Sequence, residues 1–357
     1  MIVCQKVIYG ILLALPLLAQ NGSRYEQTNL VSDLPGMAKR TDTNLVNAWG
    51  IASSGTGPWW VNSAGKGLSL VYNGDGAAFP PASPLIVTVP PAGASEPTGI
   101  VFNDTGQFAV GPNQPAVFLF ANTNGTISGW NPNANATAAV IKVTTSGAAY
   151  TGLTLGRISG NPVLYAANFA GGVEVFNGSF GPVNLPSGAF HDPQIPSGYA
   201  PFNVQNIGGS IFVMFAKVAP DGDEEPGPGL GYVDQFTPEG ALVLRLEHGS
   251  WMNAPWGIVA APPGFGSMSN QLLVGQFGGG QIASFNPENG KFKGLMIGSG
   301  KEPVEIEGLW GIRFGNGGNA GSPLELFFAA GIQDEAHGLF GKLTPATDDN
   351  SEGKDKD

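Results

Sequence analysis

A short motif recurs six times at nearly constant spacing, and this repeat restricts the possible folds more than any other feature of the chain. In each copy, an aromatic residue or a threonine precedes glycine or asparagine, and an aliphatic residue follows. The middle residues are Gly50, Gly99, Gly152, Asn203, Gly257 and Gly311, separated by 49, 53, 51, 54 and 54 residues. Sequence periods of about 20–50 residues are typical of solenoids, propellers and other arrays. We therefore expect six copies of one supersecondary unit.

Each repeat has the pattern of four short strands. The motif itself is the first, strand A, and an apolar run rich in β-branched or aromatic residues follows as strand B. An aromatic residue with turn chemistry then ends strand C, as in Tyr72-Asn73-Gly74 and Trp130-Asn131-Pro132. Such turns join antiparallel strands. Four antiparallel strands repeated radially predict an all-β fold, a six-bladed β-propeller with four-stranded blades. A pair of β-sandwiches is the alternative, but it does not explain the six-fold spacing.

The last repeat lacks its fourth strand. It contains Trp310–Phe314, Leu324–Ala329 and Leu339–Leu343, and then runs into a polar tail. Near the other end of the chain, Tyr25–Val31 has the pattern of a strand but belongs to no repeat. We expect the ring to be closed by this N-terminal strand, because closure would protect the two free edges that an open ring exposes.

The N-terminus has the pattern of a secretory signal. Lys6 precedes a 12-residue apolar run, Val7–Leu18, and Ala19 offers a small residue at the cleavage position. The run is shorter than the roughly 20 residues that a spanning helix needs. A buried N-terminal strand or helix is the alternative. We expect a signal peptide over residues 1–19, the propeller over 20–345, and a disordered acidic tail over 346–357, in a protein that is secreted to the periplasm or the extracellular space.

Charge and cysteine content exclude several classes of partner. The chain has 16 Lys and Arg against 27 Asp and Glu, a net charge of −11, and no basic run. Such a chain repels phosphate backbones, so we expect no nucleic-acid partner. The single cysteine, Cys4, lies in the predicted signal peptide, which excludes disulfides and thiolate metal sites from the mature protein. We expect a monomer without membrane contact after cleavage, with a small molecule or carbohydrate as ligand.

Several segments resemble known proteins. Asn253–Ile258, Leu272–Ile282, Glu307–Gly318 and Ala329–Gly341 are similar to a family of secreted hypothetical proteins of about 350 residues, some of which carry a PEP-CTERM sorting tail. The resemblance covers about residues 24–345 and brings no established activity. More distantly, the Pro-Trp-Gly-Ile strand starts resemble NHL-repeat and gluconolactonase-type six-bladed propellers, a likeness of fold that does not by itself imply function.

Strand order predicts which residues share one mouth of the central channel. In a four-stranded blade, the connections from D to A and from B to C lie on the same face. The B-to-C connections place five candidate ligand-binding residues there, namely Asn62, Asn122, Asn168, Lys217 and Gln276. The longest of these connections, Lys217–Gly231, is acidic, and long loops on a rigid scaffold often carry function. Solvated charges, including Asp221, Asp223, Glu224 and Glu225, are the alternative.

The same face holds the residues that we assign to metal binding and catalysis. Gluconolactonase-like propellers hold a divalent ion at this mouth, and the resemblance implies Asn47, Asn203, Asn253 and Glu307 as metal ligands. Oxygen ligands without thiols suit Ca²⁺. Glu335 and His337 form the closely spaced acid and histidine pair that is expected to supply a general base. The structural alternative is that the amides cap strand ends and that Glu335 and His337 hydrogen-bond the last blade.

Two functions from different classes are therefore open. One is a calcium-assisted hydrolase or lactonase. The other is a non-enzymatic propeller that binds a carbohydrate, a peptide or a surface partner. In the second case the aromatic residues near the mouth stack on the ligand, and these are Trp60, Tyr150, Phe169, Phe202 and Phe277. A purely structural role is a third alternative.

Export is expected to remove residues 1–19, so the mature chain should begin at Gln20. Mass spectrometry of the exported protein tests this directly. A protein that retains Met1–Leu18 would show that the apolar run is part of the folded chain.

Overall fold

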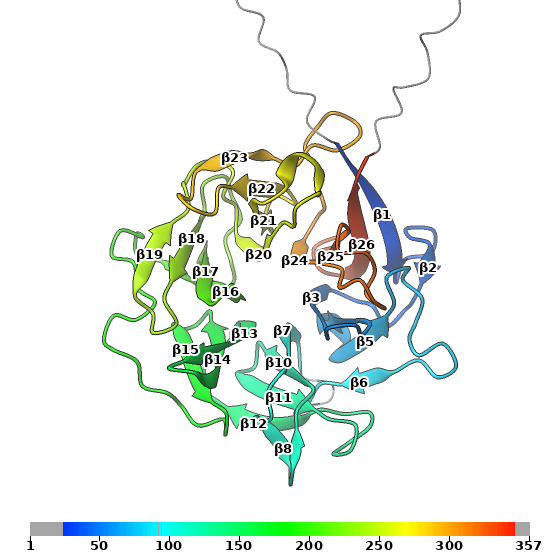
Figure 1. The fold of residues 1–357 in the computed structure, drawn as a ribbon, viewed down its shortest axis with the longest axis vertical. Helices are drawn as coiled ribbons and strands as arrows, with labels where there is room; N and C mark the ends of the chain where they lie inside the picture. The colour runs from blue at the N-terminus through cyan, green and yellow to red at the C-terminus, as the bar shows by residue number, and fades with distance from the viewer. Residues whose placement is uncertain (1–23, 92, 94, 347–357) are drawn as a thin grey trace, which may run out of the picture.

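Six sheets stand around one axis in the computed structural model, which describes residues 24–346 except 92 and 94 (Figure 1). The predicted signal peptide and all but the first residue of the predicted acidic tail lie outside the described residues. Blades one and two contain β3 (Ala48–Ser53), β4 (Trp59–Ser63), β5 (Leu68–Tyr72) and β6 (Ile86–Thr88), then β7 (Pro97–Phe102), β10 (Phe118–Asn122), β11 (Thr126–Trp130) and β12 (Val140–Thr144). Blades three and four contain β13 (Tyr150–Ile158), β14 (Asn161–Asn168) and β15 (Val173–Asn177), then β16 (Tyr199–Ile207), β17 (Ser210–Lys217), β18 (Gly231–Phe236) and β19 (Leu242–Arg245).

The last two blades complete the ring. Blade five contains β20 (Pro255–Ala260), β21 (Leu272–Gln276), β22 (Ile282–Phe285) and β23 (Phe292–Leu295), and blade six contains β24 (Leu309–Phe314), β25 (Leu326–Ile332) and β26 (His337–Pro345), with β1 (Tyr25–Ser32) and β2 (Arg40–Thr41) at its outer edge. A two-stranded hairpin, β8 (Ala109–Gly111) and β9 (Gln114–Pro115), and two 3₁₀ turns, η1 (Ala64–Lys66) and η2 (Gly266–Met268), lie in the connections. The predicted six-bladed propeller is thus confirmed.

Blade three departs from the four-stranded pattern, because its sheet ends at β15. The chain beyond β15 still touches it, through a hydrogen bond from Val183 N to Val175 O and a single bridge between Phe176 and Pro182. Proline has no N–H to donate, so Pro182 and Pro186 do not extend a ladder. This segment therefore follows the blade edge without becoming a strand.

The N-terminal strand closes the ring, as predicted. β1 pairs antiparallel with β26, from Tyr25 opposite Pro345 to Ser32 opposite Leu339. Tyr25 also holds the fifth blade, since its hydroxyl donates to Phe265 O over 2.9 Å and its N–H donates to Ile297 O. One strand therefore joins the two ends of the chain and ties them to the neighbouring blade.

The motif glycines let the innermost strands of adjacent blades approach each other closely. A Cβ atom on Gly50 would lie 2.2 Å from Thr98 O, one on Gly257 2.6 Å from Trp310 O, and one on Gly311 2.9 Å from Trp49 O. Real Cβ atoms do not come this close to a carbonyl oxygen, so these positions need glycine. The fourth motif has Asn203 instead, and its Nδ2 donates to the equivalent carbonyl, Trp256 O, over 2.8 Å.

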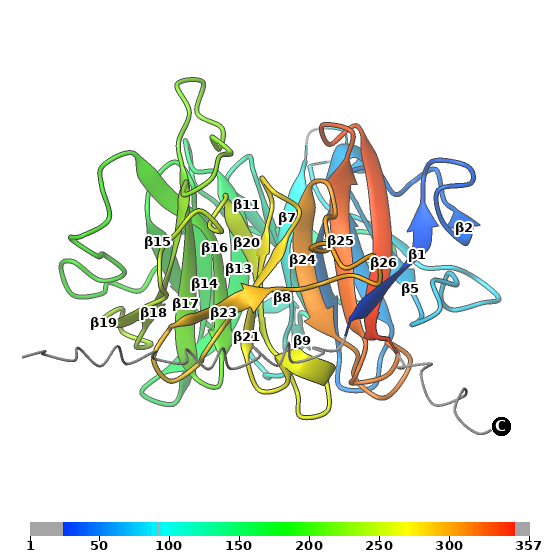
Figure 2. The same cartoon turned by 90° about the horizontal axis from the view of Figure 1, so that it is seen from above.

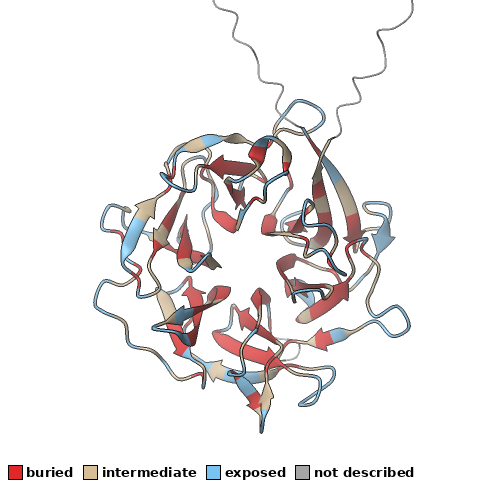
Figure 3. Ribbon diagram, in the orientation of Figure 1, coloured by how far each residue is buried: buried red, intermediate tan, exposed pale blue. Residues whose placement is uncertain are grey.

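The motif tryptophans meet on the axis. The ring centroids of Trp49 and Trp310 are 3.7 Å apart, and those of Trp256 and Trp310 are 5.9 Å apart. Phe202 and Phe277 complete this aromatic cluster, and Phe277 stacks on Trp310 with centroids 3.9 Å apart. Figure 3 shows that the inner ends of the blades are mostly buried. The three tryptophans serve mainly to pack the blades together, since each is at most 6% exposed.

Over the described part of the chain, none of the helices reaches the length and apolar character needed to cross a lipid bilayer.

Gly257→Ala should destabilise the protein by about 1–3 kcal/mol, because the added methyl group must displace the next blade or bend its own strand. Gly55→Ala is the matched control, since a Cβ atom there meets nothing within 4 Å. Urea unfolding of both variants measures the difference. Equal stability of the two variants would contradict the close approach of the strands as a structural requirement.

Candidate functional site

Two connections project from the same face of the propeller, the upper face in Figure 2. They are the β17–β18 loop, residues 218–230, and the β25–β26 turn, residues 333–336. The loop is anchored to blade five, where Asn253 Oδ1 accepts a hydrogen bond from Gly227 N over 2.6 Å and Leu230 bridges to Asn253. These two connections and the chain segments around Asn47 and Glu96 form what we call the acidic mouth.

The β25–β26 turn has an unusual backbone. Gln333, Asp334 and Glu335 have φ values of 54°, 51° and 62°, and Asn47 opposite them has a φ value of 47°. Residues other than glycine rarely adopt this left-handed region, and it persists only where the surroundings enforce it. Here the N–H of Gln333 donates to Glu307 Oε1 over 2.9 Å. The turn is thus held in a conformation that directs Glu335 toward Asn47.

Asn47 joins the turn to the aromatic cluster. Its Nδ2 donates to Glu335 Oε2 over 2.5 Å, and its Oδ1 accepts a hydrogen bond from Trp310 Nε1 over 3.1 Å. Asn47 is 7% exposed and Trp310 is fully buried. This chain of hydrogen bonds from Trp310 through Asn47 fixes the position of the Glu335 carboxyl above the axis. Two predicted site residues, Asn47 and Glu335, are therefore in direct contact.

The carboxyl groups of the acidic mouth perturb one another. Burial raises the pKa of Glu335; the hydrogen bond from Asn47 opposes this rise, and the charges of Glu96 and Asp223 add to it. Burial also raises the pKa of Glu224 to about 7, with a further contribution from the charge of Glu335. Carboxyl groups whose pKa values are raised by burial and by neighbouring charges are often found at functional sites. This mouth would gain from a bound positive charge.

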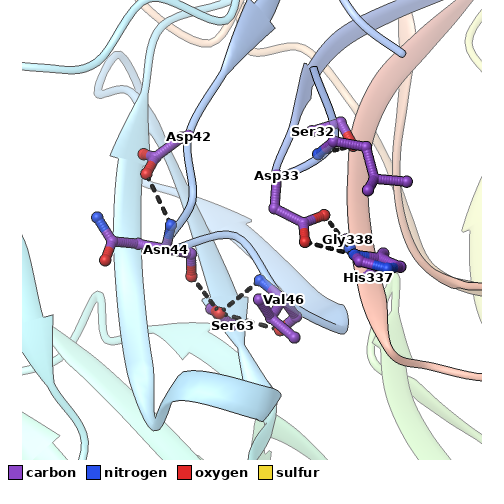
Figure 4. Close-up of polar contacts among 9 residues, drawn as sticks. Ser32, Asp33, Asp42, Asn44, Val46, Ser63, His337 and Gly338 are labelled. Atoms are coloured by element: carbon purple, nitrogen blue, oxygen red, sulfur yellow. Dashed lines mark hydrogen bonds and ion pairs between the residues drawn. The ribbon is translucent and has the colours of Figure 1, made fainter. Parts of the chain in front are cut away.

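His337 is oriented by an aspartate that the sequence did not reveal. His337 Nδ1 and Asp33 Oδ2 are 2.6 Å apart, and Asp33 Oδ1 accepts a hydrogen bond from Gly338 N over 2.9 Å (Figure 4). The His337 side chain is 31% exposed and Asp33 is 10% exposed. An aspartate in this position can fix the tautomer and orientation of the imidazole ring. Asp33 directly follows the closing strand β1. This position next to the last blade was the only feature of the sequence that could have indicated a contact with His337.

The four predicted calcium ligands lie in different local environments. Asn203 lies in the middle of β16, where its Oδ1 accepts from Val204 N. Asn253 Oδ1 accepts from Gly227 N, and the exposed Glu307 accepts from Gln333 N. The Oδ1 of Asn47 likewise accepts a hydrogen bond from Trp310 Nε1. Each of the four residues therefore has a side-chain oxygen that already accepts an N–H hydrogen bond. Within residues 24–346, apart from 92 and 94, no three His, Asp or Glu side chains form a group that could hold a metal ion. Calcium binding stays a prediction.

The predicted ligand-binding residues end the second strand of their blades. Asn62 Nδ2 donates to Thr98 O, Asn122 Nδ2 to Thr126 Oγ1, and Asn168 Nδ2 to Glu174 Oε1. Gln276 Oε1 accepts from Asn253 N, which brings two predicted site residues together. These four carboxamides are buried, whereas the Lys217 ammonium lies 5.4 Å from the centroid of the Tyr199 ring. The carboxamides stabilise turns and neighbouring blades, as the structural alternative expects, and ligand contact by any of the five residues stays a prediction.

The aromatic residues expected to stack on a ligand are mostly inside the protein. Trp60 is 4% exposed, Phe169 is 7% exposed, and Tyr150 and Phe202 are fully buried. Trp60 packs on Phe118, with ring centroids 4.4 Å apart. The faces of these rings pack against other side chains within and between blades, so they are not free to stack on a ligand.

Six blades around one axis, with a sheet completed by the N-terminal strand, define a six-bladed β-propeller. The chain is 30% identical over 323 residues to uncharacterized protein R648 of Acanthamoeba polyphaga mimivirus, a match that covers 88% of this chain and 78% of that protein. It is 28% identical to uncharacterized protein L690 of the same virus, over 88% of this chain and 84% of the relative. The chain therefore belongs to the family that includes R648. No protein-family model matches the chain.

Solved structures of similar fold include virginiamycin B lyase from Staphylococcus aureus. The selenomethionine-substituted enzyme is 14% identical with a TM-score of 0.49, and the match covers 90% of this chain and 99% of the lyase. A catalytically inactive form with quinupristin is 12% identical with a TM-score of 0.50 over the same shares. At these identities, the likeness shows a shared fold alone. It agrees with the expected distant resemblance to other six-bladed propellers.

The raised pKa of Glu224 predicts how stability depends on pH. Between about 4.5, its ordinary value, and about 7, the folded protein binds more protons at Glu224 than the unfolded chain does. Stability therefore falls as the pH rises through this window. Glu224→Gln should be more stable than the parent by about 1–3 kcal/mol at pH 8 and nearly equal to it at pH 4.5.

Denaturant unfolding of both proteins at pH 4.5, 6 and 8 measures this difference. The comparison is needed because burial also raises the pKa of Asp234 to about 7, and Asp234 contributes in the same window in both proteins. Glu225→Gln, which changes the exposed neighbour, is the matched control and should track the parent. A constant difference between Glu224→Gln and the parent across this pH range would contradict the raised pKa.

Proposed function

We propose that the acidic mouth binds a cationic ligand and that the protein is a ligand-binding propeller. The observation that carries this proposal is the convergence of Glu224 and Glu335, which come from blades four and six. The pKa values of both carboxyl groups are raised, and the charge of Glu335 contributes to the rise at Glu224. A ligand ammonium group would relieve their mutual repulsion and would favour the ionised form of both. Peptides with lysine side chains and amino sugars carry this group.

The geometry of the mouth supports an organic cation. Glu335 is held in place by Asn47 and by the left-handed turn, so little side-chain freedom is lost when a ligand binds. Glu224 sits on a loop that is pinned to blade five through Asn253. An ammonium group with a flexible tether can contact carboxylates at different spacings, whereas a calcium ion needs several oxygens at about 2.3–2.6 Å.

Trilysine should bind the protein more tightly than its Nε-acetylated form, which has the same backbone without the side-chain charges. Glu224→Gln and Glu335→Gln should each weaken trilysine binding by about tenfold, which corresponds to about 1.4 kcal/mol. Glu239→Gln is the control, since this exposed residue lies in the β18–β19 turn on the opposite face. Isothermal titration calorimetry at pH 8 and low salt measures all five affinities, two peptides with the parent and trilysine with each of the three variants. Equal affinity for the two peptides would refute the proposal, as would a loss of affinity in Glu239→Gln equal to that in the mouth variants.

A hydrolase or lactonase is the second candidate, and the Asp33–His337 pair favours it. His337 Nε2 makes no hydrogen bond to any described residue, and Asp33 holds the other ring nitrogen. In this arrangement Nε2 can take a proton from water as a general base. Calcium, if held by the predicted oxygen ligands, would polarise a carbonyl group.

An aryl lactone such as dihydrocoumarin tests this candidate. The parent should hydrolyse it faster than buffer does, and His337→Ala should reduce the excess rate to background. His248→Ala is the control and should retain activity, since it removes an exposed histidine whose Nε2 lies 2.9 Å from its hydrogen-bond acceptor, Gly229 O. Assays with added CaCl₂ and with EDTA test the metal prediction separately. The absence of any excess rate in both conditions would exclude lactonase activity on this substrate.

Secretion, the monomeric state and kinship with the secreted PEP-CTERM-associated proteins complete the proposal. Support for secretion comes from the charge and apolar pattern of residues 1–19. Inside a cell, phosphate groups would compete with the acidic mouth for cationic peptides and amino sugars. Outside the cytoplasm this competition would be weaker.

A further inference from the structure

Arg313 lies near the other end of the channel, away from the acidic mouth. It belongs to β24 and lines a small axial cavity of about 20 Å³ as well as a pocket of about 350 Å³. The pocket is formed where the innermost strands β3, β16, β20 and β24 end, so it opens on the face opposite the acidic mouth. Arg313 therefore places a positive charge at the junction between the axis and this second face.

The Arg313 guanidinium has no partner in the described part of the chain. It forms neither a hydrogen bond nor an ion pair there, whereas Arg245 contacts both Asp192 and Asp234. No Asp or Glu lines the axial cavity or the pocket. Arg313 is half-buried, and the loss of water around it lowers its pKa, but an arginine side chain stays protonated in proteins. An unpaired charge that is partly removed from water is costly, and a bound anion would offset that cost.

The surroundings of Arg313 combine polar donors with an apolar wall. Gln205 lines both the cavity and the pocket, and Ser53 lines the pocket. Neither of these two side chains forms a hydrogen bond with another described residue. Most of the remaining lining is apolar and comprises Ile207, Ile258, Val259, Ala260, Pro262, Phe314 and Pro323. Arginine recognises carboxylates through two parallel hydrogen bonds, and pockets of about 300–1,000 Å³ suit small ligands.

We infer that this pocket binds a small organic carboxylate, with the carboxylate on Arg313 and an apolar tail against the wall of the pocket. Gln205 and Ser53 can donate further hydrogen bonds to the anion. Arg313 would then be the specificity-determining residue, because a neutral ligand of the same shape would leave the guanidinium unpaired. This site is separate from the acidic mouth and does not depend on the function proposed for it.

Hexanoate is a suitable probe, with hexanol as its neutral counterpart and inorganic phosphate as an anion without a tail. Calorimetric titration of the full chain should show hexanoate binding at least about tenfold tighter than hexanol and phosphate, as expected when one charged hydrogen-bonded pair is added or removed. If hexanol binds as tightly as hexanoate, or if hexanoate does not bind at all, the inference is overturned. Tighter binding of phosphate than of hexanoate would overturn the apolar-tail assignment.

Two substitutions separate the guanidinium from general surface charge. Arg313→Met should lose at least about tenfold in hexanoate affinity, and Arg313→Lys should keep part of it because the charge remains. Arg157→Met is the control, since Arg157 is exposed at the end of β13 on the same face and contributes equally to net charge. Thermal melting verifies that each variant is folded. Unchanged affinity in a folded Arg313→Met would overturn the inference, and so would an equal loss in Arg157→Met.

Discussion

The close contact between innermost strands at the motif glycines is the constraint on which the whole ring depends. A missing side chain at Gly50, Gly257 and Gly311 lets a main-chain carbonyl of the next blade lie against the strand. Six strands can then gather around one narrow axis, and the space left for a cavity among them is only about 20 Å³. At that volume the channel has room for about one water molecule. A small organic ligand would therefore not fit in this axial cavity.

The same packing gives the two ends different chemistry. On one side, the motif tryptophans form a buried aromatic floor, and Asn47 transmits the position of Trp310 to Glu335. Acidic connections meet above that floor. On the other side, the strands end in apolar residues around the unpaired cation of Arg313. One propeller thus presents a negatively charged mouth and a positively charged pocket, and the aromatic cluster separates them.

The fold was largely predictable from the sequence because it depends on local and periodic signals. The motif spacing predicted six blades, and the unassigned strand at Tyr25 predicted closure. The candidate site was less predictable, because its contacts join residues that are far apart in sequence and depend on loop conformation. Nothing local relates Asp33 to His337, or Glu224 to Glu335. Asn203 illustrates this limit. Its place in an innermost strand could be predicted from the motif. Its hydrogen bond to Trp256 O could not, because that carbonyl comes close only when the blades pack into a ring.

Closure by β1 also has a consequence for the order in which the protein can be assembled. The first of the described strands to leave the ribosome pairs with the last of them, since Tyr25 lies opposite Pro345. Five blades can form from neighbouring strands as the chain grows, but the sixth sheet cannot be completed before β26 has been synthesised. During that interval β1 and the edge of the fifth blade lack their final neighbours, and unpaired strand edges are prone to associate with other chains. A chain that crosses a membrane unfolded, as the predicted signal peptide implies, would postpone ring closure until β26 has arrived on the far side.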